Sequence, residues 1–461
     1  MTLTRRTFIK SAAAAGALAL TRPWGALADT LGPASTFSTS RSSRLFTGIK
    51  LVHADMHNHT TLSDGDGDPE GAFASMRNAG LDVAALTDHS TIGWGTPVDP
   101  CFWGCGGEEA LAGIDEEKWA QLQVLADAAN RNGQFIALRG FEWSSPFQGH
   151  MNVWFSKRWI DPLHTGGGTF GEGAAWFAHD EGMPLPPEFV TAYNDAVRKL
   201  PTTGLAMLGF YDWLKAAPNR AVLGGGSDGI ASFNHPGREP GRFSQFKLNR
   251  TVIPQVVALE IFNRSSDYLF QGTDGGTQSP LNECLNAGWK VGLSGVTDEH
   301  GTNWGVPEGK GRTGLWVNRW TRDEVKRAMQ TRHFFATRLR GLRVDATAKR
   351  VKMGWWVKHT SGPVQFKLDI DRGSDWWGKA LNVQVLRPGT SMPTVAANVP
   401  VVVPTDAEPV ITFTVPLNLA DGNWVVLRVA DPSQPPDGRA DAQWAAYGNA
   451  VAYTSPWFLI P

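Results

Sequence analysis

Residues 51–65, LVHADMHNHTTLSDG, are the stretch on which the fold prediction rests. The apolar start is typical of a buried strand that runs into a loop. His57 and His59 are two positions apart, so their imidazoles leave the same face of the extended chain and can converge on one metal ion. Asp64 follows just past the expected strand end. A His-x-His pair is weak by itself, so this interpretation depends on the rest of the chain.

The segments that follow predict a βαβ unit. Residues 69–79 begin with a proline suited to a first helical turn and stop at Gly80. Residues 81–86 form a second buried strand, which ends in Thr87-Asp88-His89. Both strands therefore deliver histidines at their C-terminal ends, where parallel α/β folds place their chemistry.

Three more strand ends carry the same residue types. Residues 135–141, 230–234 and 290–296 are expected strands, and they lead into Glu142, His235 and the Asp298-x-His300 pair, while His150 opens a further apolar run. Such side chains are costly to bury unpaired, so their gathering at consecutive strand ends predicts bound metal ions. The candidate ligands are His57, His59, Asp64, His89, Glu142, His150, His235, Asp298 and His300.

Other polar residues near these strand ends have more than one interpretation. We expect Asp88 to orient a ligand rather than to bind metal. Glu260 and Asn263 end the expected strand 256–262 and are either supporting groups or ordinary strand-end residues. Three basic residues fall just after site motifs, namely Arg238, Lys310 and Arg312. They either bind an anionic group or are solvated surface charges.

The remaining pattern predicts an α/β region followed by a β-rich one. Helices are expected at 115–130, 281–287 and 321–330, the last with a capping box of Thr321 and Glu324, before a strand at 333–337. Residues 94–113 are a long insertion, a plausible loop over the site. After residue 341 the alternation of apolar and polar residues is typical of an antiparallel β-sandwich. The expected domains are 49–340 and 341–461.

The N-terminus has the features of a targeting segment. Arg5, Arg6, Phe8 and Lys10 resemble the twin-arginine export signal, and residues 26–28 form a small-residue cleavage site. Residues 1–28 are thus an expected signal peptide and 29–48 a linker. No later apolar run has the length of a membrane span. We expect a periplasmic or secreted protein whose partner during export is the twin-arginine machinery.

Composition limits the remaining partners. The chain has 461 residues and a formal net charge of −1 without runs of like charge, so we expect no nucleic-acid partner and instead a small-molecule substrate. Most of the 20 tryptophans are expected in the core. Cys101 and Cys105 can pair locally, and Cys284 is expected to be a small buried apolar residue.

These motifs resemble those of the PHP (polymerase and histidinol phosphatase) metallohydrolase superfamily, in order and context, over residues 51–340. The His-x-His strand, the T-D-H, the isolated Glu, the H-P-G and the D-x-H carry the resemblance. The unit RDEVKRAMQTRHFFAT and the β-rich C-terminus look further like the branch that includes carbaryl (carbamate) hydrolases. The resemblance implies a distorted (β/α)7 barrel that binds two or three divalent ions, Zn, Mn or Fe.

The resemblance also implies a ligand assignment. His57, His59, Glu142 and Asp298 hold one metal in this assignment, and a bridging Glu142 shares a second with His150 and His235. Asp64, His89 and His300 hold a third, with Asp64 where some members have His. Glu142, Asp298 and His300 are the expected catalytic residues.

Such a centre acidifies a bound water, which can attack the phosphorus of a phosphoryl group or the carbon of a carbonyl group. The leading expectation is a phosphoesterase. A carbamate or carboxyl-ester hydrolase is the alternative, since Trp94, Trp103, Trp143, Trp154 and Trp304 are candidates to line an apolar pocket. An exported metal- or glycan-binding module is a third interpretation. The complete ligand set favours an enzyme.

Overall fold

The structure is a computed structural model in which Phe37–Pro461 form one compact unit. It describes residues 41–90, 113–145, 148–162, 165, 205–221, 223–238, 242–270, 278–306, 309–405, 410–435, 440 and 442–461. The predictions for the signal peptide, most of the insertion, Cys101 and Cys105 lie outside these residues. His164 and His179 lie outside them too; neither has a partner motif in the sequence, and we expect both to be surface or packing residues.

The expected βαβ unit is present. Strand β1 (Lys50–Asp55) pairs in parallel with β2 (Val83–Leu86), with Ala54 opposite Val83. Helix α2 (Pro69–Asn78) connects them, and the Asp68 side chain caps it by accepting a hydrogen bond from the Glu70 amide. The proline in the first turn and the Asp cap start this helix where the sequence predicts it.

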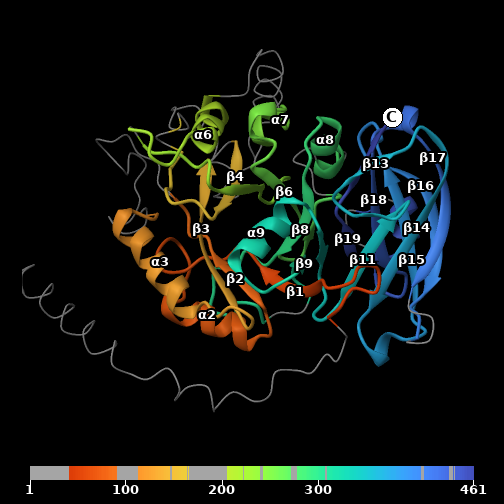
Figure 1. Cartoon of the computed structure of the whole chain (residues 1–461), viewed down its shortest axis with the longest axis horizontal. Coiled ribbons are helices and arrows are strands. Elements are labelled where there is room, and N and C mark those ends of the chain that lie inside the picture. Colours follow the sequence, from red (N-terminus) through yellow and green to blue (C-terminus); the bar gives the residue numbers. More distant parts are fainter. Residues whose placement is uncertain are drawn as a thin grey trace, which may run out of the picture. The chain divides into compact units, whose positions relative to one another are not determined.

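The sheet continues from β2 through six more described strands, β3 to β8 (Figure 1). Strand β3 (Ile136–Ser145) is parallel to β2, and β4 (Gly149–Trp154) runs antiparallel between β3 and β5 (Ile230–Phe233). Parallel pairing resumes with β6 (Val256–Asn263) and then β8 (Gly292–Val296). The short β7 (Ser266–Asp267) folds back on the end of β6.

The described strands do not close into the expected barrel. Strand β9 (Arg312–Val317), which the sequence interpretation missed, pairs antiparallel with the free edge of β1, and β10 (Phe334–Thr337) pairs with β9. Both edges of β1 are therefore occupied. Strand β8 reaches the end of β1 through single bonds, such as the 3.0 Å bond from the Asp298 amide to the His57 carbonyl. The result is a mixed α/β sheet.

Helices cover the sheet and are capped by their own sequences. Asp115 caps α3 (Glu116–Ala129), and Thr321 caps α9 (Arg322–Gln330) through a 3.3 Å bond from the Glu324 amide. The predicted capping box is only half formed, because the Glu324 carboxylate accepts the Asn318 amide instead. No described helix is both long and apolar enough to cross a membrane. The other helices are α6 (Leu205–Lys215), α7 (Arg242–Gln245), α8 (Pro280–Asn286), α10 (Ala442–Ala445) and the 3-10 turns η1 (Arg250–Val252), η2 (Ser374–Trp376) and η3 (Leu419–Asp421).

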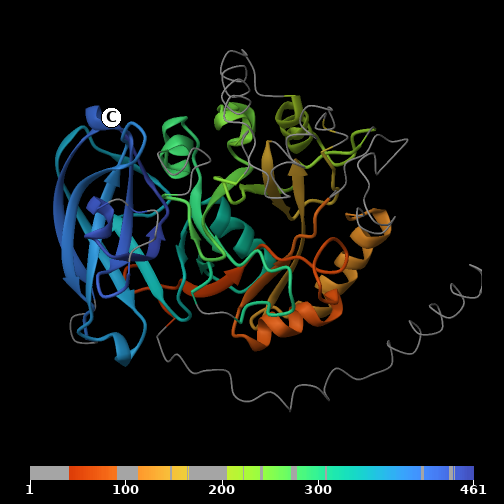
Figure 2. The ribbon, with the colours of Figure 1, turned by 180° about the vertical axis from the view of Figure 1, so that it is seen from behind.

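The chain after β10 forms two layers of mostly antiparallel strands, gathered far from α2 and α3 in Figures 1 and 2. The smaller layer has the order β12-β11-β14-β17, and the other continues the main sheet because β19 pairs with β10. A shared apolar core includes Phe366 of one layer and Val383 and Leu427 of the other. The strands are β11 (Arg343–Ala348), β12 (Val351–Lys352), β13 (Trp356–Lys358), β14 (Ser361–Asp371), β15 (Ala380–Arg387), β16 (Thr394–Val402), β17 (Ile411–Asn418), β18 (Trp424–Asp431), β19 (Asn449–Thr454) and β20 (Trp457–Ile460).

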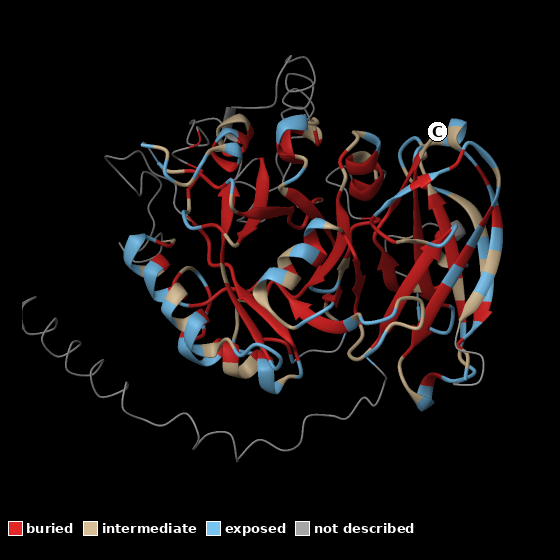
Figure 3. Cartoon of the chain, viewed as in Figure 1, coloured by how far each residue is buried: buried red, intermediate tan, exposed pale blue. Residues whose placement is uncertain are grey.

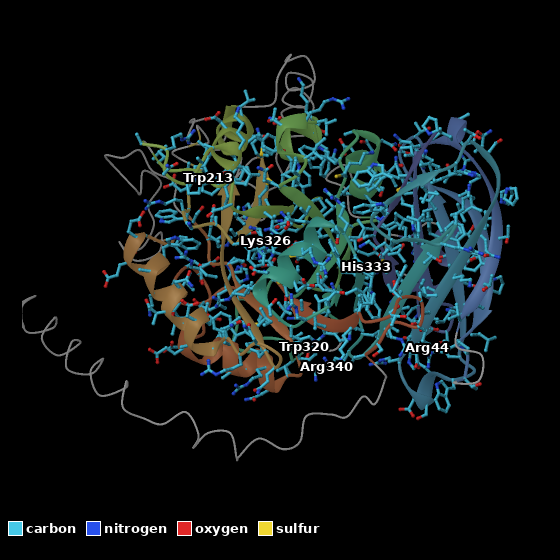
Figure 4. The ribbon with its side chains drawn as sticks, viewed as in Figure 1. Arg44, Trp213, Trp320, Lys326, His333 and Arg340 are labelled. Carbon is cyan, nitrogen blue, oxygen red and sulfur yellow. The ribbon has the colours of Figure 1, made fainter. Side chains whose placement is uncertain are left out.

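Large side chains, among them those of several tryptophans, are fully buried in the interior. Figure 3 shows that most residues of the central strands are buried. Cys284 is buried, as predicted. Trp143 and Trp154 are core residues with no more than 2% exposure. They are therefore too buried to line an open substrate pocket of the kind expected for a carbamate hydrolase. Trp213, marked in Figure 4, is also fully buried. Near the start of the described residues, Arg44, which is labelled in Figure 4, pairs with Asp369. The two side chains are 3.6 Å apart, and the pair ties the first described segment to β14.

Candidate metal centre

The polar strand-end residues meet in one buried cluster. His57 and His59 follow β1, His89 follows β2, and Glu142 lies within β3. His150 lies on β4, His235 follows β5, and Asp298 and His300 follow β8. The parallel strands bring their carboxyl ends to one edge, and the antiparallel β4 places His150 there by its start rather than its end. All nine candidate ligands lie at this edge.

The first group consists of His57, His59 and Asp298. Their ligand atoms lie within 4.8 Å of one another. His57 Nε2 is 3.1 Å from His59 Nε2, and Asp298 Oδ1 is 3.3 Å from His59 Nε2. Glu142 Oε1 joins them at 3.1 Å from His57 Nε2. The structure therefore brings together the four residues assigned to the first metal.

The second group surrounds Asp64. Its Oδ2 lies 3.5 Å from His89 Nε2 and 3.4 Å from His300 Nε2, which are the partners expected from the sequence. His59 also belongs to this group, since its Nδ1 is 3.8 Å from Asp64 Oδ1. His59 thus presents one nitrogen to each of the first two groups. Asp64 and His300 are the more exposed members, with side chains 36% and 28% accessible.

The third group is centred on Glu142. It contains His89, Glu142 and His150, so the structure adds His89 to the residues expected there. His150 Nδ1 lies 3.4 Å and His235 Nε2 3.3 Å from Glu142 Oε1. His235 is near the carboxylate but belongs to none of the three groups of described residues whose ligand atoms lie within 4.8 Å of one another. Glu142 is the residue that all three groups approach.

Glu260 supports the cluster from β6. Its Oε1 is 2.8 Å from His57 Nδ1, and its Oε2 accepts bonds from the His235 amide at 2.8 Å and from Asn263 Nδ2 at 2.9 Å. Glu260 and Asn263 are therefore supporting groups rather than ordinary strand-end residues, because Glu260 holds His57 and the His235 amide and Asn263 holds Glu260. Support of this kind fixes the ring orientation and tautomer of a ligating histidine.

Two further residues hold the cluster in place. Asn234 Nδ2 donates to Glu142 Oε1 at 2.7 Å. Asp88 is in none of the metal-compatible groups of the described residues, and it accepts bonds from the Thr60 amide and the Ser63 hydroxyl at 2.7 and 2.8 Å. Asp88 therefore holds the loop that carries Asp64, and its role in orienting a metal ligand stays a prediction.

Positive backbone φ angles occur at three non-glycine residues of this region. They are His235 at 25°, Arg264 at 51° and Asp298 at 48°. Such conformations cost free energy in residues with a Cβ and persist where surrounding contacts enforce them. Contacts at this edge therefore hold His235, Arg264 and Asp298 in these conformations.

The carboxylates of the cluster are ionised although they are buried. Burial alone would raise the pKa of Glu142, but His57, His150 and His89 outweigh it and hold that pKa well below its usual range. Burial opposes ionisation of Asp298 too, yet His57, His59 and Arg264 hold its pKa well below the usual range. Both residues are acceptor-only groups near neutral pH.

The pKa of His59 is shifted in the opposite direction from those of His57 and His89. Burial, together with His300 and His89, lowers the pKa of His59 to about 3, so its imidazole is neutral and able to bind a metal. Burial also disfavours the charged form of His89, but Asp64 and Glu142 raise its pKa to about 10. Without an ion, protons on His89 and His57 balance the carboxylates.

This donor set fits divalent metal ions. Imidazoles and carboxylates are ligands of Zn, Mn and Fe, and their ligand atoms already lie within the spread that one ion can span. His59 Nδ1 is fully buried and has no hydrogen-bond partner among the described residues. A buried donor or acceptor left unpaired is costly, and a ligand at that position would remove the cost.

Two arginines with partly exposed side chains lie beside the buried carboxylate of Asp298. Arg264 Nη2 lies 3.3 Å from Asp298 Oδ2 and 3.0 Å from His300 Nδ1. No motif in the sequence marks Arg264 as a site residue. Arg238 Nη1 lies 3.7 Å from the same carboxylate oxygen. Lys310 is paired with Glu299 at 2.6 Å, and its side chain is 32% accessible. Arg312 is buried with its guanidinium on the Gly305 carbonyl, so it is not a solvated surface charge.

No family model and no curated protein matches the chain. Solved structures do match. A two-domain protein from Bacteroides vulgatus containing a predicted PHP-like metal-dependent phosphoesterase is 13% identical, with 90% of this chain and 98% of that chain covered and a TM-score of 0.39. A candidate metal-dependent phosphoesterase from Bifidobacterium adolescentis is 13% identical, with coverages of 54% and 88% and a TM-score of 0.25. An amidohydrolase from Chromobacterium violaceum with bound sulfate and no metal is 15% identical, with coverages of 54% and 87% and a TM-score of 0.21. At these values the likenesses do not define the function of this chain, which has to be inferred from its own geometry.

Proposed function

We propose that the protein is a metal-dependent hydrolase and that its substrates are phosphate esters. The observation that carries this proposal is the convergence of the histidines and carboxylates around Glu142, with two arginines beside Asp298 at the exposed side. The cluster accounts for the metal dependence. The arginines favour an anionic substrate over the uncharged esters of the carbamate alternative.

Bound divalent ions supply a Lewis acid and a water of lowered pKa. The first group, with Glu142, would hold one ion, and the groups around Asp64 and around Glu142 would hold the others. Glu260 and Asn234 keep the ligands oriented. Arg238 and Arg264 bind the anionic group of the substrate and orient it against the cluster. Asp64 and His300 lie on the side from which the substrate enters, since they are the exposed members.

The finer assignments belong to the same proposal. The order of the five motifs supports membership of the PHP superfamily with its distorted (β/α)7 arrangement, and the unit at residues 322–337 supports the carbaryl-hydrolase-like branch. The paired arginines at positions 5 and 6 support twin-arginine export to the periplasm or beyond. The metals are Zn, Mn or Fe, two or three per chain.

The proposed activity is tested with purified protein stripped of metal by a chelator and then loaded with Zn²⁺, Mn²⁺ or Fe²⁺. Metal content is measured by mass spectrometry, and hydrolysis is followed with 4-nitrophenyl phosphate, bis(4-nitrophenyl) phosphate, 1-naphthyl N-methylcarbamate and 4-nitrophenyl acetate. We expect metal-dependent turnover of a phosphate ester. Turnover of the carbamate or acetate alone would replace the substrate class, and tight metal binding without turnover of any ester would leave a binding module.

Export is tested separately. Replacing Arg5 and Arg6 by Lys should leave precursor in the cytoplasm, while the unchanged protein matures near Asp29. Fractionation followed by N-terminal sequencing measures both. Normal export of the doubly substituted protein would exclude the twin-arginine route.

A further inference from the structure

The β6–β7 turn links the metal cluster to the C-terminal strands. Asn263 pairs with Ser266 and Phe262 with Asp267, so Arg264 and Ser265 form a two-residue turn. Arg264 has a φ of 51°, a conformation that tight hairpin turns require and that glycine or asparagine usually provides. An arginine at this position is strained, so the contacts around the turn have to enforce the conformation.

Three contacts hold the turn. The Arg264 amide donates to the Val296 carbonyl at 3.2 Å, at the end of β8. Arg338 Nη2, just after β10, donates to the Ser265 carbonyl at 2.8 Å. The Tyr453 hydroxyl of β19 lies 3.1 and 3.0 Å from the two oxygens of Asp267. The last of these contacts comes from the C-terminal strands.

The Tyr453–Asp267 contact is buried and supported on its far side. Both side chains are fully buried, and a lone carboxylate at such a place would be costly. Arg428 Nε donates to the Tyr453 oxygen at 3.1 Å, and Arg428 Nη1 donates to Gln384 at 2.7 Å. The hydroxyl is therefore fixed by β18 and β15, and it transmits the position of those strands to Asp267.

The turn carries two groups to the cluster. Arg264 Nε donates to the Asp298 carbonyl at 3.1 Å, and Arg264 Nη2 reaches the Asp298 carboxylate and His300. Asn263 Nδ2 holds Glu260, which in turn holds His57. A displaced turn would consequently move the guanidinium first, because Glu260 keeps its bond from the His235 amide.

We propose that Tyr453 is a positioning residue, which holds the β6–β7 turn through Asp267 and so fixes the Arg264 guanidinium where it binds the anionic group of the substrate. This inference gives the C-terminal strands a role in the site and rests, for its kinetic consequence, on the proposed function. Tyr453 touches neither the cluster nor the substrate. It acts through the conformation of Arg264.

The first test measures the turn itself and does not depend on activity. Hydrogen–deuterium exchange of the full-length, metal-loaded protein is compared between wild type and Tyr453→Phe. The peptide covering residues 261–268 should exchange at least about threefold faster in the variant, because one contact of a strained turn is gone. Tyr447→Phe is the matched control, since it removes a hydroxyl in the same C-terminal region from a half-buried side chain that packs against Trp444. Asp267→Asn serves as a second variant and should loosen the same peptide.

The second test uses 4-nitrophenyl phosphate. Tyr453→Phe should raise KM by roughly three- to tenfold with kcat and metal content close to wild type, as expected when a charged substrate contact is misplaced. Arg264→Ala should raise KM by at least as much. Tyr453→Phe added to Arg264→Ala should then raise KM no further, because the two changes remove the same contact.

The exchange and kinetic tests have outcomes that would overturn the proposed role of Tyr453. Unchanged exchange at 261–268 in both Tyr453→Phe and Asp267→Asn overturns the inference whatever the kinetics show. Faster exchange with an unchanged KM would make the Tyr453–Asp267 contact structural only, and this result also overturns the inference. The inference is overturned as well if Tyr453→Phe raises KM by the same factor in the wild type and in Arg264→Ala. If the metal-loaded wild type hydrolyses no ester, the proposed function fails, while the exchange result still decides whether Tyr453 holds the turn.

Discussion

At the scale of single residues, Glu142 is the centre of the site. Its Oε1 lies within 3.4 Å of His57, His150 and His235, and its Oε2 lies 2.8 Å from His89 Nδ1. The resemblance to the PHP superfamily implies that His89 binds one metal only. The structure places it between Asp64 and Glu142, so its loss affects two groups.

Glu142→Ala should therefore reduce bound metal by more than one ion where all sites fill and remove most activity. His89→Ala should weaken metal binding by about 10 to 100-fold, the usual cost of a lost ligand or of its support. Metal analysis and far-UV circular dichroism check both variants, and the spectra should stay unchanged because the strands around the cluster are apolar.

His179→Ala is the control for these variants, since its sequence context offers no metal motif. Full metal content and full activity in Glu142→Ala would place the site elsewhere. Loss of both in His179→Ala would have the same meaning.

His53 gives a pH dependence of stability that is separate from the ligands. Burial, with Arg41 and Arg312, lowers its pKa to about 3 from 6.5 in the unfolded chain. Between these values the unfolded chain binds a proton that the folded protein does not, so the folded state loses stability as the pH falls from about 6.5 to about 3. The slope is about 1.4 kcal/mol per pH unit.

Denaturant unfolding of the metal-free protein at pH 7.5, 6, 5 and 4 measures this slope. In His53→Gln the loss of stability on acidification should be smaller by about 1.4 kcal/mol for each pH unit below 6.5. Identical slopes in the two proteins would show that His53 does not titrate in this way.

At the scale of elements, the close approach of β8 to β9 depends on Gly295. A Cβ there would meet the Arg312 carbonyl oxygen at 2.5 Å and the Arg312 amide nitrogen at 2.8 Å, and both belong to the backbone of β9. A side chain at this position separates the strand that leads to Asp298 from its neighbour.

Gly295→Ala should consequently destabilise the protein by on the order of 1–3 kcal/mol and weaken metal binding. Gly71→Ala is the matched control in α2, where a Cβ meets no atom within 4 Å. It should stabilise the helix by about 0.5–1 kcal/mol. Thermal unfolding measures both, and a Gly295→Ala protein as stable as wild type would contradict the packing described.

At the scale of the whole molecule, the C-terminal strands complete the sheet that carries the site. Strand β10 pairs with β19, and Trp316 and Phe335 belong to the same apolar cluster as the C-terminal layers. The division near residue 340 stays a prediction as a domain boundary. It is a change in strand pattern, and the hydrogen-bonded sheet crosses it.

A chain that covers only residues 29–340 should be insoluble or lack cooperative unfolding, because it exposes the edge of β10 and the apolar side chains that the C-terminal strands cover. Solubility and thermal unfolding are compared with those of residues 29–461. A soluble, cooperatively folded 29–340 chain would show that the first region is stable alone.

The sequence by itself determined the local elements and the candidate ligands. Proline and aspartate caps, buried apolar runs and strand-end histidines are short-range signals, and they located β1, α2, β2, α8 and α9 to within a few residues. Most of the candidate ligands gather at one edge because parallel strands place their carboxyl ends together, and His150 joins them from the start of the antiparallel β4. The pattern also indicated the β-rich character of residues 341–461.

The tertiary structure alone decided how these parts close on one another. Strand β9 occupies the edge of β1 that a closed barrel would need for β8, which no pattern within either strand reveals. The Glu324 carboxylate caps Asn318 rather than Thr321, and His89 faces two carboxylates. Arg264 enters the site because a strained turn is held by Tyr453, far along the chain. Such contacts join residues distant in sequence, and their partners are set by packing and by long-range pairing, which local residue preferences do not encode.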